Sequence, residues 1–284
     1  MANFSDVLIT CDYDRTLTAP DGSIPERNLE AIRYFTENGG AFTINTGRGM
    51  AMSRPFLNRV PFNAPLLLCN GSTAYDPWKQ EFLFAHTIPL DQGTLIRELQ
   101  ELVPHSIVEF QALERHYIFR ENQVWKEFNR LNFCPDGYAD PDDDLGPFVK
   151  LCIYDNLEES TVAHLFRATP EQMAYFDSVE QKIRARYENE LTILRVAPRI
   201  IDIHAKGVNK GQAATELKQK LEKKLLVCIG DEYNDLAMLQ AADYAYSPAD
   251  GRIANLFENV CDCAEGAVAD VIYKKIPEIL GKMP

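Results

Sequence analysis

The sequence lacks the features that would place a chain across a membrane or in an oxidising compartment. Its 284 residues contain no uninterrupted apolar run of about 20, the length needed to span a bilayer. No basic stretch precedes the first short apolar run, Val7–Cys11, so a secretory signal peptide is not expected. The seven cysteines are odd in number and scattered, which is not the pattern of a disulfide framework. We therefore expect a cytoplasmic protein.

The sequence is also short of positive charge. Lysine and arginine number 29 against 42 aspartates and glutamates, which gives a formal net charge of −13. No long basic run offsets this excess, so binding to nucleic acid or to an anionic membrane is not expected. If the ligand is itself an anion, its site must be made locally positive by a metal ion, a helix N-terminus or a few placed cationic side chains.

Four apolar runs share one layout, in which small or polar residues follow the run directly. The runs are Val7–Cys11, Ala41–Asn45, Pro65–Cys69 and Leu225–Ile229. Continuous apolar runs of this length predict strands that are buried on both faces, as in parallel sheets. A helix is expected at Pro25–Asn38, because proline stands at its start and two glycines stand beyond its end. This alternation predicts an α/β fold with a doubly wound, Rossmann-like parallel sheet, whose ligands bind at the carboxyl ends of the strands.

The middle of the chain has a different pattern. From residue 86 to residue 197, helical stretches alternate with short strand-like stretches that have no polar cluster at their ends. The predicted helices are Asp91–Leu102, Glu158–Ala168 and Glu180–Asn189, and the predicted strands are Ile107–Gln111, His116–Arg120, Val149–Tyr154 and Leu191–Val196. The mixture predicts a separate α+β module. We therefore expect residues 1–85 and 198–284 to form a core domain, with 86–197 inserted as a second domain.

Two carboxylates, Asp12 and Asp14, follow the first apolar run one residue apart. If the strand continues through them, both side chains lie on one face and their like charges repel. A second acidic pair, Asp231 and Asp235, follows the fourth run. If the two strands are neighbours, four carboxylates converge on one crevice, and an oxygen-rich cluster of this kind suits Mg²⁺. The alternative is that the aspartates only cap helices and form turns.

Other polar residues near the predicted strand ends suit an anionic ligand. Thr46 and Gly47 follow the second run and can offer a hydroxyl group and backbone N–H groups. Lys210 begins the helix expected before the fourth run, between two glycines, and is predicted to reach inward to a phosphate. Arg48 can bind the same anion, but it can equally bind a helix or point to solvent.

Four short segments together resemble a known family. DYDRT, TGR, NKG and GDEYND stand in the order of the four motifs of haloacid-dehalogenase-superfamily phosphatases. The TGR after the second run, the CNG after the third and the large insertion that follows are similar to the branch often called Cof-type or class IIB. The resemblance implies a Rossmann-like core with an inserted α/β cap domain that selects the substrate. Two positions depart from the family pattern, because Arg15 stands where the family usually carries glycine and Pro248 stands where many relatives carry asparagine.

The resemblance also implies a mechanism. Asp12 would attack phosphorus to form an aspartyl-phosphate, and Asp14 would protonate the leaving group and later take a proton from water. Crowding beside Asp12 would help to keep Asp14 protonated. Mg²⁺ is the implied cofactor. Its implied ligands are Asp12, the backbone carbonyl of Asp14, Asp231 and, in support, Asp235. The implied phosphoryl-binding groups are the backbone N–H groups of Tyr13 and Gly47 and the side chains of Thr46, Lys210 and Asn234.

The implied substrates are small phosphorylated metabolites, with sugar phosphates foremost. Candidate substrate-selecting residues in the inserted module are Arg115, His116, Arg120, Trp125 and Lys126, although each is also compatible with an ordinary role in a strand or a helix. The sequence does not predict an oligomeric state.

Three alternative functions stay open. A sugar phosphomutase on the same scaffold would keep Asp12 and Asp14 but would return the phosphoryl group to a second hydroxyl. A receiver-like signalling module also carries paired acids, threonine and lysine, but there the lysine ends the last strand, whereas here Lys210 precedes Asp231. A non-catalytic phosphate binder would not need all four motifs intact.

Overall fold

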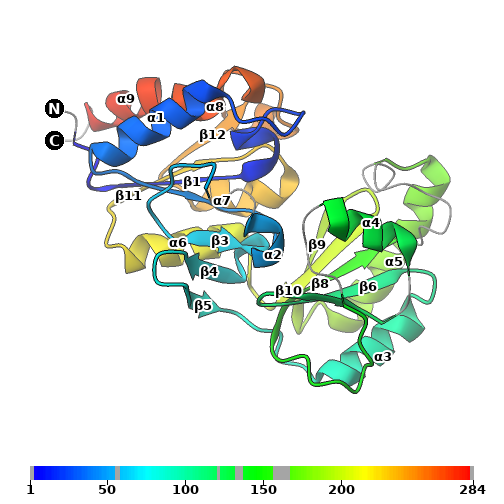
Figure 1. Ribbon diagram of the computed structural model, residues 1–284. Coiled ribbons are helices and arrows are strands. Elements are labelled where there is room, and N and C mark those ends of the chain that lie inside the picture. Colours follow the sequence, from blue (N-terminus) through cyan, green and yellow to red (C-terminus); the bar gives the residue numbers. More distant parts are fainter. Residues whose placement is uncertain (1–2, 55–57, 120–121, 132–136, 156–166, 282–284) are drawn as a thin grey trace. The chain divides into compact units, whose positions relative to one another are not determined.

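The computed structural model describes residues 3–54, 58–119, 122–131, 137–155 and 167–281. The chain divides into two compact units, which are coloured along the chain in Figure 1. The first unit consists of Met1–Arg48, Phe56–Phe84 and Asn209–Pro284, and the second consists of Gly49–Pro55 and Ala85–Val208. Within the described ranges, none of the helices has the length and apolar character that crossing a membrane would require.

The first unit is built on a parallel sheet. Its strands lie in the order β13, β12, β11, β1, β2, and every neighbouring pair is parallel. The strands are β1 (Val7–Cys11), β2 (Ala41–Ile44), β11 (Leu225–Ile229), β12 (Tyr244–Pro248) and β13 (Glu258–Val260). Every residue of β1 and β2 is buried, as continuous apolar runs in a covered parallel sheet should be. The predicted α/β fold is confirmed.

Helices cover both faces of this sheet (Figure 1). One face carries α1 (Glu26–Glu37), α8 (Ala267–Asp270) and α9 (Ile276–Leu280), and the other carries α6 (Lys210–Lys220) and α7 (Leu236–Ala241). The α6–α7 layer packs on the sheet through Leu217 and Leu239, which share a core cluster with Leu8 of β1. A smaller three-stranded sheet consists of β3 (Leu66–Leu68), β4 (Thr73–Asp76) and β5 (Glu81–Ala85).

The strand order of the first unit places its polar residues at one edge. Asp12, Asn45 and Gly230 each follow the last residue of β1, β2 and β11, and these three strands are parallel neighbours. Their carboxyl ends therefore meet at the same edge, the usual place for a ligand in a doubly wound sheet.

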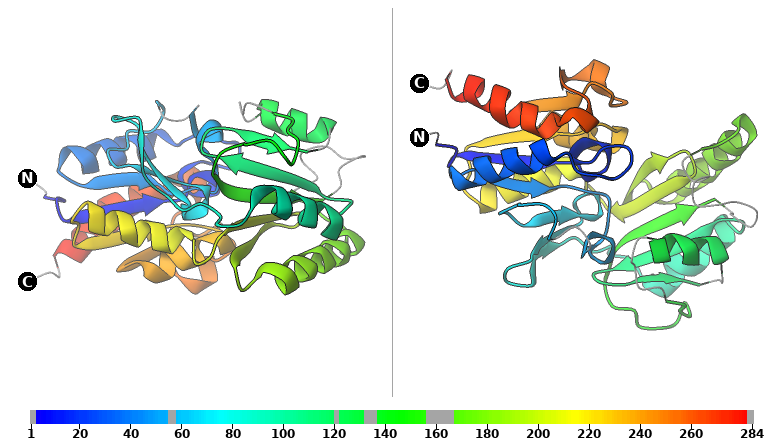
Figure 2. Two further views of the ribbon diagram at one scale, coloured as in Figure 1. Left: turned by 90° about the horizontal axis from the view of Figure 1, so that it is seen from below. Right: turned by 45° about the horizontal axis from the view of Figure 1, so that its top comes forward.

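The second unit contains a five-stranded sheet in the order β7, β6, β8, β10, β9, with antiparallel neighbours. The strands are β6 (Ile107–Ala112), β7 (His116–Ile118), β8 (Phe148–Tyr154), β9 (Leu191–Ala197) and β10 (Ile200–Ala205), and the helices are α2 (Met50–Ser53), α3 (Gln92–Leu102), α4 (Gln123–Leu131) and α5 (Pro170–Tyr187). Helices α3 and α5 pack together on one face of this sheet, and α4 packs on the other face through Trp125 (Figure 2, left).

The predicted domain boundary at residue 197 needs a correction. Strand β10 pairs with both β8 and β9, so the second unit continues to Val208. The sequence Pro198-Arg199 resembles the end of a module, but it is the turn of a β9–β10 hairpin. A proline is found both in the turn of a hairpin and at the end of a domain. Only the pairing of β10 with β8 and β9 shows that Pro198 lies in a hairpin turn.

The elements predicted inside the second unit agree with the structure where it describes them. Helix α3 begins one residue after Asp91, whose side chain caps it, and the predicted Glu180–Asn189 is the later part of α5, which Thr169 caps. The predicted helix Glu158–Ala168 falls largely on residues 156–166, and that part of it lies outside the described residues, as does Arg120.

Candidate active site

Asp12 directly follows β1, which lies between β11 and β2 in the parallel sheet of the first unit. Its backbone N–H donates to the carbonyl of Ile229 at 2.9 Å, and the N–H of Asn45 donates to the carbonyl of Cys11 at 2.8 Å. These bonds continue the β11–β1 and β1–β2 ladders one residue beyond the strands. The two ladders hold the backbone at Asp12 between β11 and the end of β2. Asp12 is buried, with 7% of the residue exposed.

Three carboxylates meet at this strand end. One oxygen from each of Asp12, Asp231 and Asp235 lies within 4.8 Å of the others. Asp235 is held by its own loop, because its Oδ2 accepts the backbone N–H groups of Asp231 at 3.0 Å and Glu232 at 3.1 Å. Gly230 leaves room for this turn, since a Cβ there would lie 2.7 Å from Asp235 Cγ. The predicted convergence of the two acidic segments is therefore present.

Lys210 places a buried ammonium group among these carboxylates. Its Nζ lies 2.5 Å from Asp12 Oδ1 and 2.6 Å from Asp235 Oδ1, and the residue is fully buried. A buried charge without a partner is costly, so an ammonium group at this position requires such carboxylates. The lysine is the first residue of α6, and Asn209 caps that helix by accepting the N–H groups of Gly211 and Gln212, each at 2.9 Å.

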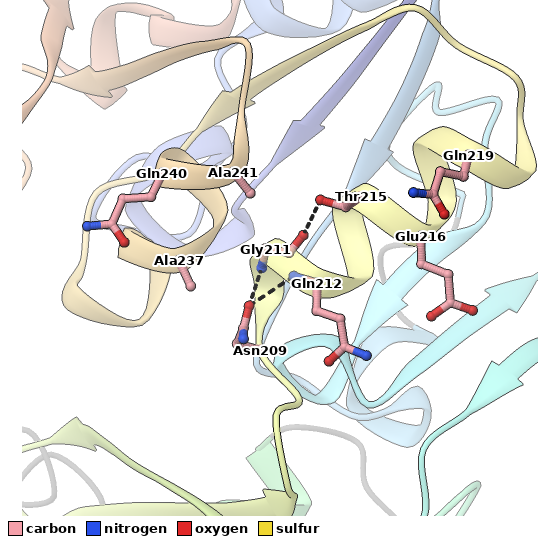
Figure 3. Close-up of a pocket in the computed structure, with 9 residues that line it drawn as sticks. All are labelled: Asn209, Gly211, Gln212, Thr215, Glu216, Gln219, Ala237, Gln240 and Ala241. Atoms are coloured by element: carbon pink, nitrogen blue, oxygen red, sulfur yellow. Dashed lines mark hydrogen bonds between the residues drawn. The ribbon is translucent and has the colours of Figure 1, made fainter.

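The start of α6 packs tightly against α7. A Cβ on Gly211 would lie 2.1 Å from the carbonyl oxygen of Ala237, so only glycine fits there. A groove of about 710 Å³ lies on the outer side of this contact (Figure 3). Its lining residues are Asn209, Gly211, Gln212, Thr215, Glu216, Gln219, Ala237, Gln240 and Ala241. Neither Lys210 nor the three clustered aspartates line this groove, so the groove and the charged cluster are separate features.

The cluster changes the proton affinity of its members. Burial raises the pKa of Asp12 well above its usual range, against the effect of the nearby Lys210 ammonium. Burial and the charge of Asp235 raise the pKa of Asp231 to about 7. Burial by itself would lower the pKa of Lys210, but Asp12 and Asp235 outweigh it and raise that pKa. The site therefore holds a charged lysine, and full ionisation of the three carboxylates would place more negative charge there than this lysine can offset.

Asp14 lies outside the cluster of three carboxylates, although its charge still acts on Asp12. Strand β1 ends at Cys11, and Asp14 lies in the irregular turn Tyr13–Leu17, so the alternation of a strand does not extend to it. Its carboxylate instead accepts two hydrogen bonds from Arg48, at 2.9 Å from Nε and 2.7 Å from Nη2. Its side chain is 54% exposed. Arg48, for which the sequence left several partners open, binds Asp14.

The remaining predicted site residues lie around Asn70. The amide nitrogen of Asn234 donates to Asn70 Oδ1 at 3.2 Å, and a Cβ on Gly47 would lie 3.0 Å from the same oxygen. The hydroxyl of Thr46, a buried residue, accepts the N–H of Arg48 at 3.2 Å. Asn70 itself has a φ of 52°, in the left-handed region that asparagine tolerates better than most residues. The TGR and GDEYND motifs thus both lie against the side chain of Asn70.

The comparison with protein families shows which family the chain belongs to. The model of the haloacid dehalogenase-like hydrolase family matches residues 9–272. The chain belongs to the haloacid dehalogenase-like hydrolase family.

Characterised relatives of this haloacid dehalogenase-like hydrolase are phosphatases. It is 23% identical over 249 residues to 5-amino-6-(5-phospho-D-ribitylamino)uracil phosphatase of Bacillus subtilis, with 86% of this chain and 87% of that protein covered. It is 22% identical over 277 residues to pyridoxal phosphate phosphatase of Escherichia coli, with 95% of this chain and 98% of that protein covered. With its family, they identify the chain as a phosphomonoester hydrolase.

A solved structure supports the fold of the hydrolase. The structure of a sugar phosphatase assigned to subclass IIB of the superfamily matches it with a TM-score of 0.74 at 17% identity, and the match covers 97% of this chain and 99% of the other. The likeness extends over both compact units, so the second unit is part of the shared fold and not an addition particular to this chain.

Sequence reasoning about the hydrolase missed one residue of the site. The hydroxyl of Thr16 donates to Asp231 Oδ1 at 2.9 Å, and the threonine is fully buried. This bond orients a carboxylate from the other end of the chain. The position of Thr16 four residues after Asp12 in the first motif was the available signal.

The conformation of Arg15 explains the glycine that the family usually has there. Its φ is 62° and its ψ is 12°, which lies in the left-handed region. Glycine enters this region without a steric cost, whereas other residues are strained by about 1–2 kcal/mol. The arginine is exposed at the surface of the first unit.

Two of the predicted substrate-selecting residues belong to a buried network of the second unit. His116 Nδ1 lies 3.3 Å from Glu109 Oε1, and the indole N–H of Trp125 donates to Glu109 Oε2. All three residues are buried. Arg115 is exposed, and the ammonium of Lys126 lies 5.1 Å from the ring centre of Tyr138. His116 and Trp125 therefore pack inside their own unit.

Proposed function

We propose that this hydrolase is a Mg²⁺-dependent phosphatase that hydrolyses small phosphorylated metabolites, with sugar phosphates foremost, through an aspartyl-phosphate on Asp12. One observation carries the proposal. A buried aspartate at the end of β1 contacts a buried lysine at 2.5 Å and lies beside two further carboxylates. This arrangement provides a nucleophile, a fixed positive charge for a phosphoryl group, and oxygen ligands for a divalent cation.

The donor set fits Mg²⁺. Hard oxygen ligands suit this ion, which uses one or two carboxylates and otherwise keeps water or substrate oxygens. Lys210 binds Oδ1 of Asp12, and Thr16 binds Oδ1 of Asp231. The Oδ2 atoms of the two aspartates accept no hydrogen bond from the described residues. Asp235 differs, because Lys210 and two backbone N–H groups use both of its oxygens. Asp12, Asp231 and the carbonyl of Asp14 would hold the ion, with Asp235 in support. When bound, Mg²⁺ offsets the negative charge of the carboxylates and of the phosphoryl oxygens.

In the first half of the reaction, a carboxylate oxygen of Asp12 forms a bond to phosphorus and the bond from phosphorus to the ester oxygen breaks. The leaving oxygen takes a proton from Asp14, which releases the alcohol. Asp14 is bound to Arg48 by two hydrogen bonds. These bonds occupy both of its carboxylate oxygens, so Asp14 must leave Arg48 before it can reach the leaving oxygen.

In the second half, a water oxygen forms a bond to phosphorus and the bond to Asp12 breaks. Asp14, now charged, accepts the proton of that water, and inorganic phosphate leaves. Ester and water are thereby converted into alcohol and phosphate, and both carboxyl groups return to their starting states.

Hydrogen-bond donors and an ammonium group that are held in place by the fold stabilise the negative charge on the transferred phosphoryl group. The proposed donors are the backbone N–H groups of Tyr13 and Gly47, the hydroxyl of Thr46, the ammonium of Lys210 and the amide of Asn234. Donors that are already held in place cost no reorganisation during the reaction, which is why they stabilise developing charge so effectively. Asn70 supports this set, because it binds Asn234 and lies against Gly47.

We assign the choice of leaving group to the second unit, as the cap domain. The two named relatives act on chemically different phosphate esters, one a ribitylaminouracil derivative and the other pyridoxal phosphate. The shared core therefore does not determine the alcohol.

The cysteines in the described part of the chain form no disulfide, which supports a reducing compartment such as the cytoplasm.

Release of free phosphate from a panel of phosphorylated metabolites tests the proposal. The panel should include hexose and pentose phosphates, pyridoxal phosphate and an aryl phosphate, each assayed with Mg²⁺ and with a chelator. We expect Mg²⁺-dependent release from at least one sugar phosphate. Conversion of a hexose phosphate into its isomer without free phosphate would show a mutase instead, and activity that survives chelation would contradict the role of the metal.

The nucleophile is tested by Asp12→Asn. The amide has the same shape but cannot form the acyl-phosphate, so turnover should fall by about 1,000-fold or more. Asp6→Asn is the matched control, since Asp6 precedes the same strand and pairs with Lys224 at the surface, at 2.9 Å. If Asp12→Asn keeps the turnover of Asp6→Asn, Asp12 is not the nucleophile.

A further inference from the structure

Asn45 is a buried asparagine whose side chain reaches the main chain of Lys210. It follows the last residue of β2 and is fully buried. Its Nδ2 donates to the carbonyl oxygen of Lys210 at 2.9 Å, across 165 positions of the sequence. Its own backbone is held by the sheet, because its N–H donates to Cys11 on one side and it forms a parallel bridge with Leu67 on the other. The amide thus extends from a rigid strand end to the start of α6.

Stability alone does not account for this asparagine. Its Oδ1 is buried and has no hydrogen-bond partner among the described residues. A buried acceptor without a partner costs about as much as a hydrogen bond contributes, or more. Asn28, another fully buried asparagine of the same unit, uses both amide atoms, toward Leu17 and Ala269. Asn45, in contrast, buries both polar atoms of its side-chain amide but forms a hydrogen bond through only one of them, Nδ2.

The main chain around Lys210 is confined from three sides. A Cβ on Gly71 would lie 2.4 Å from the carbonyl oxygen of Asn209, and a Cβ on Gly211 would lie 2.1 Å from that of Ala237. These glycines let two neighbouring segments approach α6 closely on either side of Lys210. Asn45 supplies the third contact, which is the directional one, because a hydrogen bond has a preferred distance and angle whereas a close approach only excludes space.

We propose that Asn45 is a positioning residue, which holds the Lys210 main chain so that the ammonium group stays between Asp12 and Asp235. The lysine side chain has four rotatable bonds, so its backbone must be fixed for the ammonium to keep contacts of 2.5 and 2.6 Å. A displacement of about 1 Å in such a group can cost about 100-fold in rate. The kinetic part of this inference rests on the proposed phosphatase function.

Asn45→Ala and Asn45→Leu test the proposal. Both remove the amide donor, and leucine also replaces the unpaired oxygen by an apolar group of similar size. We expect kcat on an aryl phosphate to fall about 10- to 100-fold in both, with a smaller change in KM. The melting temperature should stay within about 3 °C of the wild type, and should be higher for Asn45→Leu than for Asn45→Ala.

Asn63→Ala is the matched control at the other end of the same strand. Asn63 accepts the N–H of Phe42 and donates to the carbonyl of Gly40, each at 2.9 Å. Loss of both bonds should lower the melting temperature and leave kcat unchanged. The proposal is overturned if both Asn45 variants keep kcat within twofold of the wild type, or if they lose activity only in proportion to a fall in melting temperature.

Amide hydrogen exchange at the start of α6 gives a readout that needs no activity. We expect Asn45→Ala to speed exchange at residues 211–214, while Asn63→Ala leaves it unchanged. If the wild type releases phosphate from no ester, the proposed function fails, but this measurement still tests the contact. Unchanged exchange in Asn45→Ala would then overturn the inference about Asn45 as well.

Discussion

Lys210 Nζ lies 2.5 Å from Asp12 Oδ1, although the two residues are 198 positions apart in the chain. The same nitrogen lies 2.6 Å from Asp235 Oδ1. One ammonium group therefore stands among three clustered carboxylates, and full ionisation leaves two negative charges without a partner. The site is arranged to accept further positive charge, and the predictions below follow from this imbalance and from the contacts around it.

Replacement of Lys210 by methionine removes the only cation that contacts the clustered carboxylates within the described residues. The buried carboxylates then lose their partner, so we expect the free energy of unfolding at pH 8 to fall by about 3–5 kcal/mol. Activity should fall at least 100-fold as well. Urea unfolding and phosphate release measure the two effects. Lys218→Met is the control, because Lys218 lies on the same helix and pairs with Asp243 at the surface, at 2.7 Å; it should lose at most about 1 kcal/mol. Equal losses in the two variants would contradict a special role for Lys210.

The stability of the metal-free protein should fall as pH rises from about 4 to about 7. The pKa of Asp231 is raised from 3.8 to about 7, so the folded state binds more protons than the unfolded state within this window. Linkage then lowers the free energy of unfolding with rising pH, by up to about 4 kcal/mol for Asp231, and the raised pKa of Asp12 acts in the same direction. The raised pKa of Lys210 acts only at alkaline pH, since its stabilisation is complete below the unfolded value.

Urea unfolding at pH 5, 6, 7 and 8 with a chelator measures this dependence. Mg²⁺ favours the charged carboxylates, so its addition should stabilise the protein most at pH 7 and 8 and should flatten the curve. Asp231→Asn should make the curve shallower, because the amide does not titrate. A curve for the metal-free wild type that rises over this window would refute the assignment.

Thr16→Val should weaken metal binding while the fold stays intact. The hydroxyl of Thr16 orients Asp231 Oδ1 at 2.9 Å, and this bond also opposes the rise in the Asp231 pKa that burial causes. Loss of an outer contact of this kind typically weakens metal affinity by about 10- to 100-fold. The Mg²⁺ concentration for half-maximal activity should rise accordingly. Thr43→Val removes another buried hydroxyl bond, to the carbonyl of Pro65 at 2.6 Å, and should leave that concentration unchanged.

Arg15→Gly should be more stable than Arg15→Ala. The φ of 62° at this position strains any residue with a Cβ, and glycine relieves that strain. The relief exceeds the extra backbone entropy of glycine in the unfolded chain by about 0.5–1 kcal/mol. Comparison of the two variants by urea unfolding isolates the backbone effect, because both lack the guanidinium group. Equal stability of the two variants would show that the turn carries no such strain.

The core of the fold could be predicted from local sequence, since its strands are buried on both faces and appear as continuous apolar runs. The β9–β10 hairpin could not, because Pro198-Arg199 is compatible with a turn and with a domain boundary. Pairing of β10 with β8 decides between them. That pairing joins segments about 50 residues apart, and no local pattern contains it.

The same contrast holds inside the candidate site. The position of Asp12 and Asp231 at the ends of two buried strands could be predicted from the sequence, whereas the structure shows that these strands are parallel neighbours, which brings both ends to one edge. The partner of Asp14 could not be predicted, since the strand stops before Asp12 and the turn that follows has irregular torsions, with a φ of 62° at Arg15. Which side chain meets which at such positions depends on loop torsions and on atoms from distant segments. The sequence by itself determined the family, the sheet and the edge that carries the acids. Only the tertiary structure decided that Arg48 binds Asp14, that Thr16 binds Asp231 and that Asn45 holds the main chain of Lys210, because each of these contacts depends on directions that a local pattern does not encode.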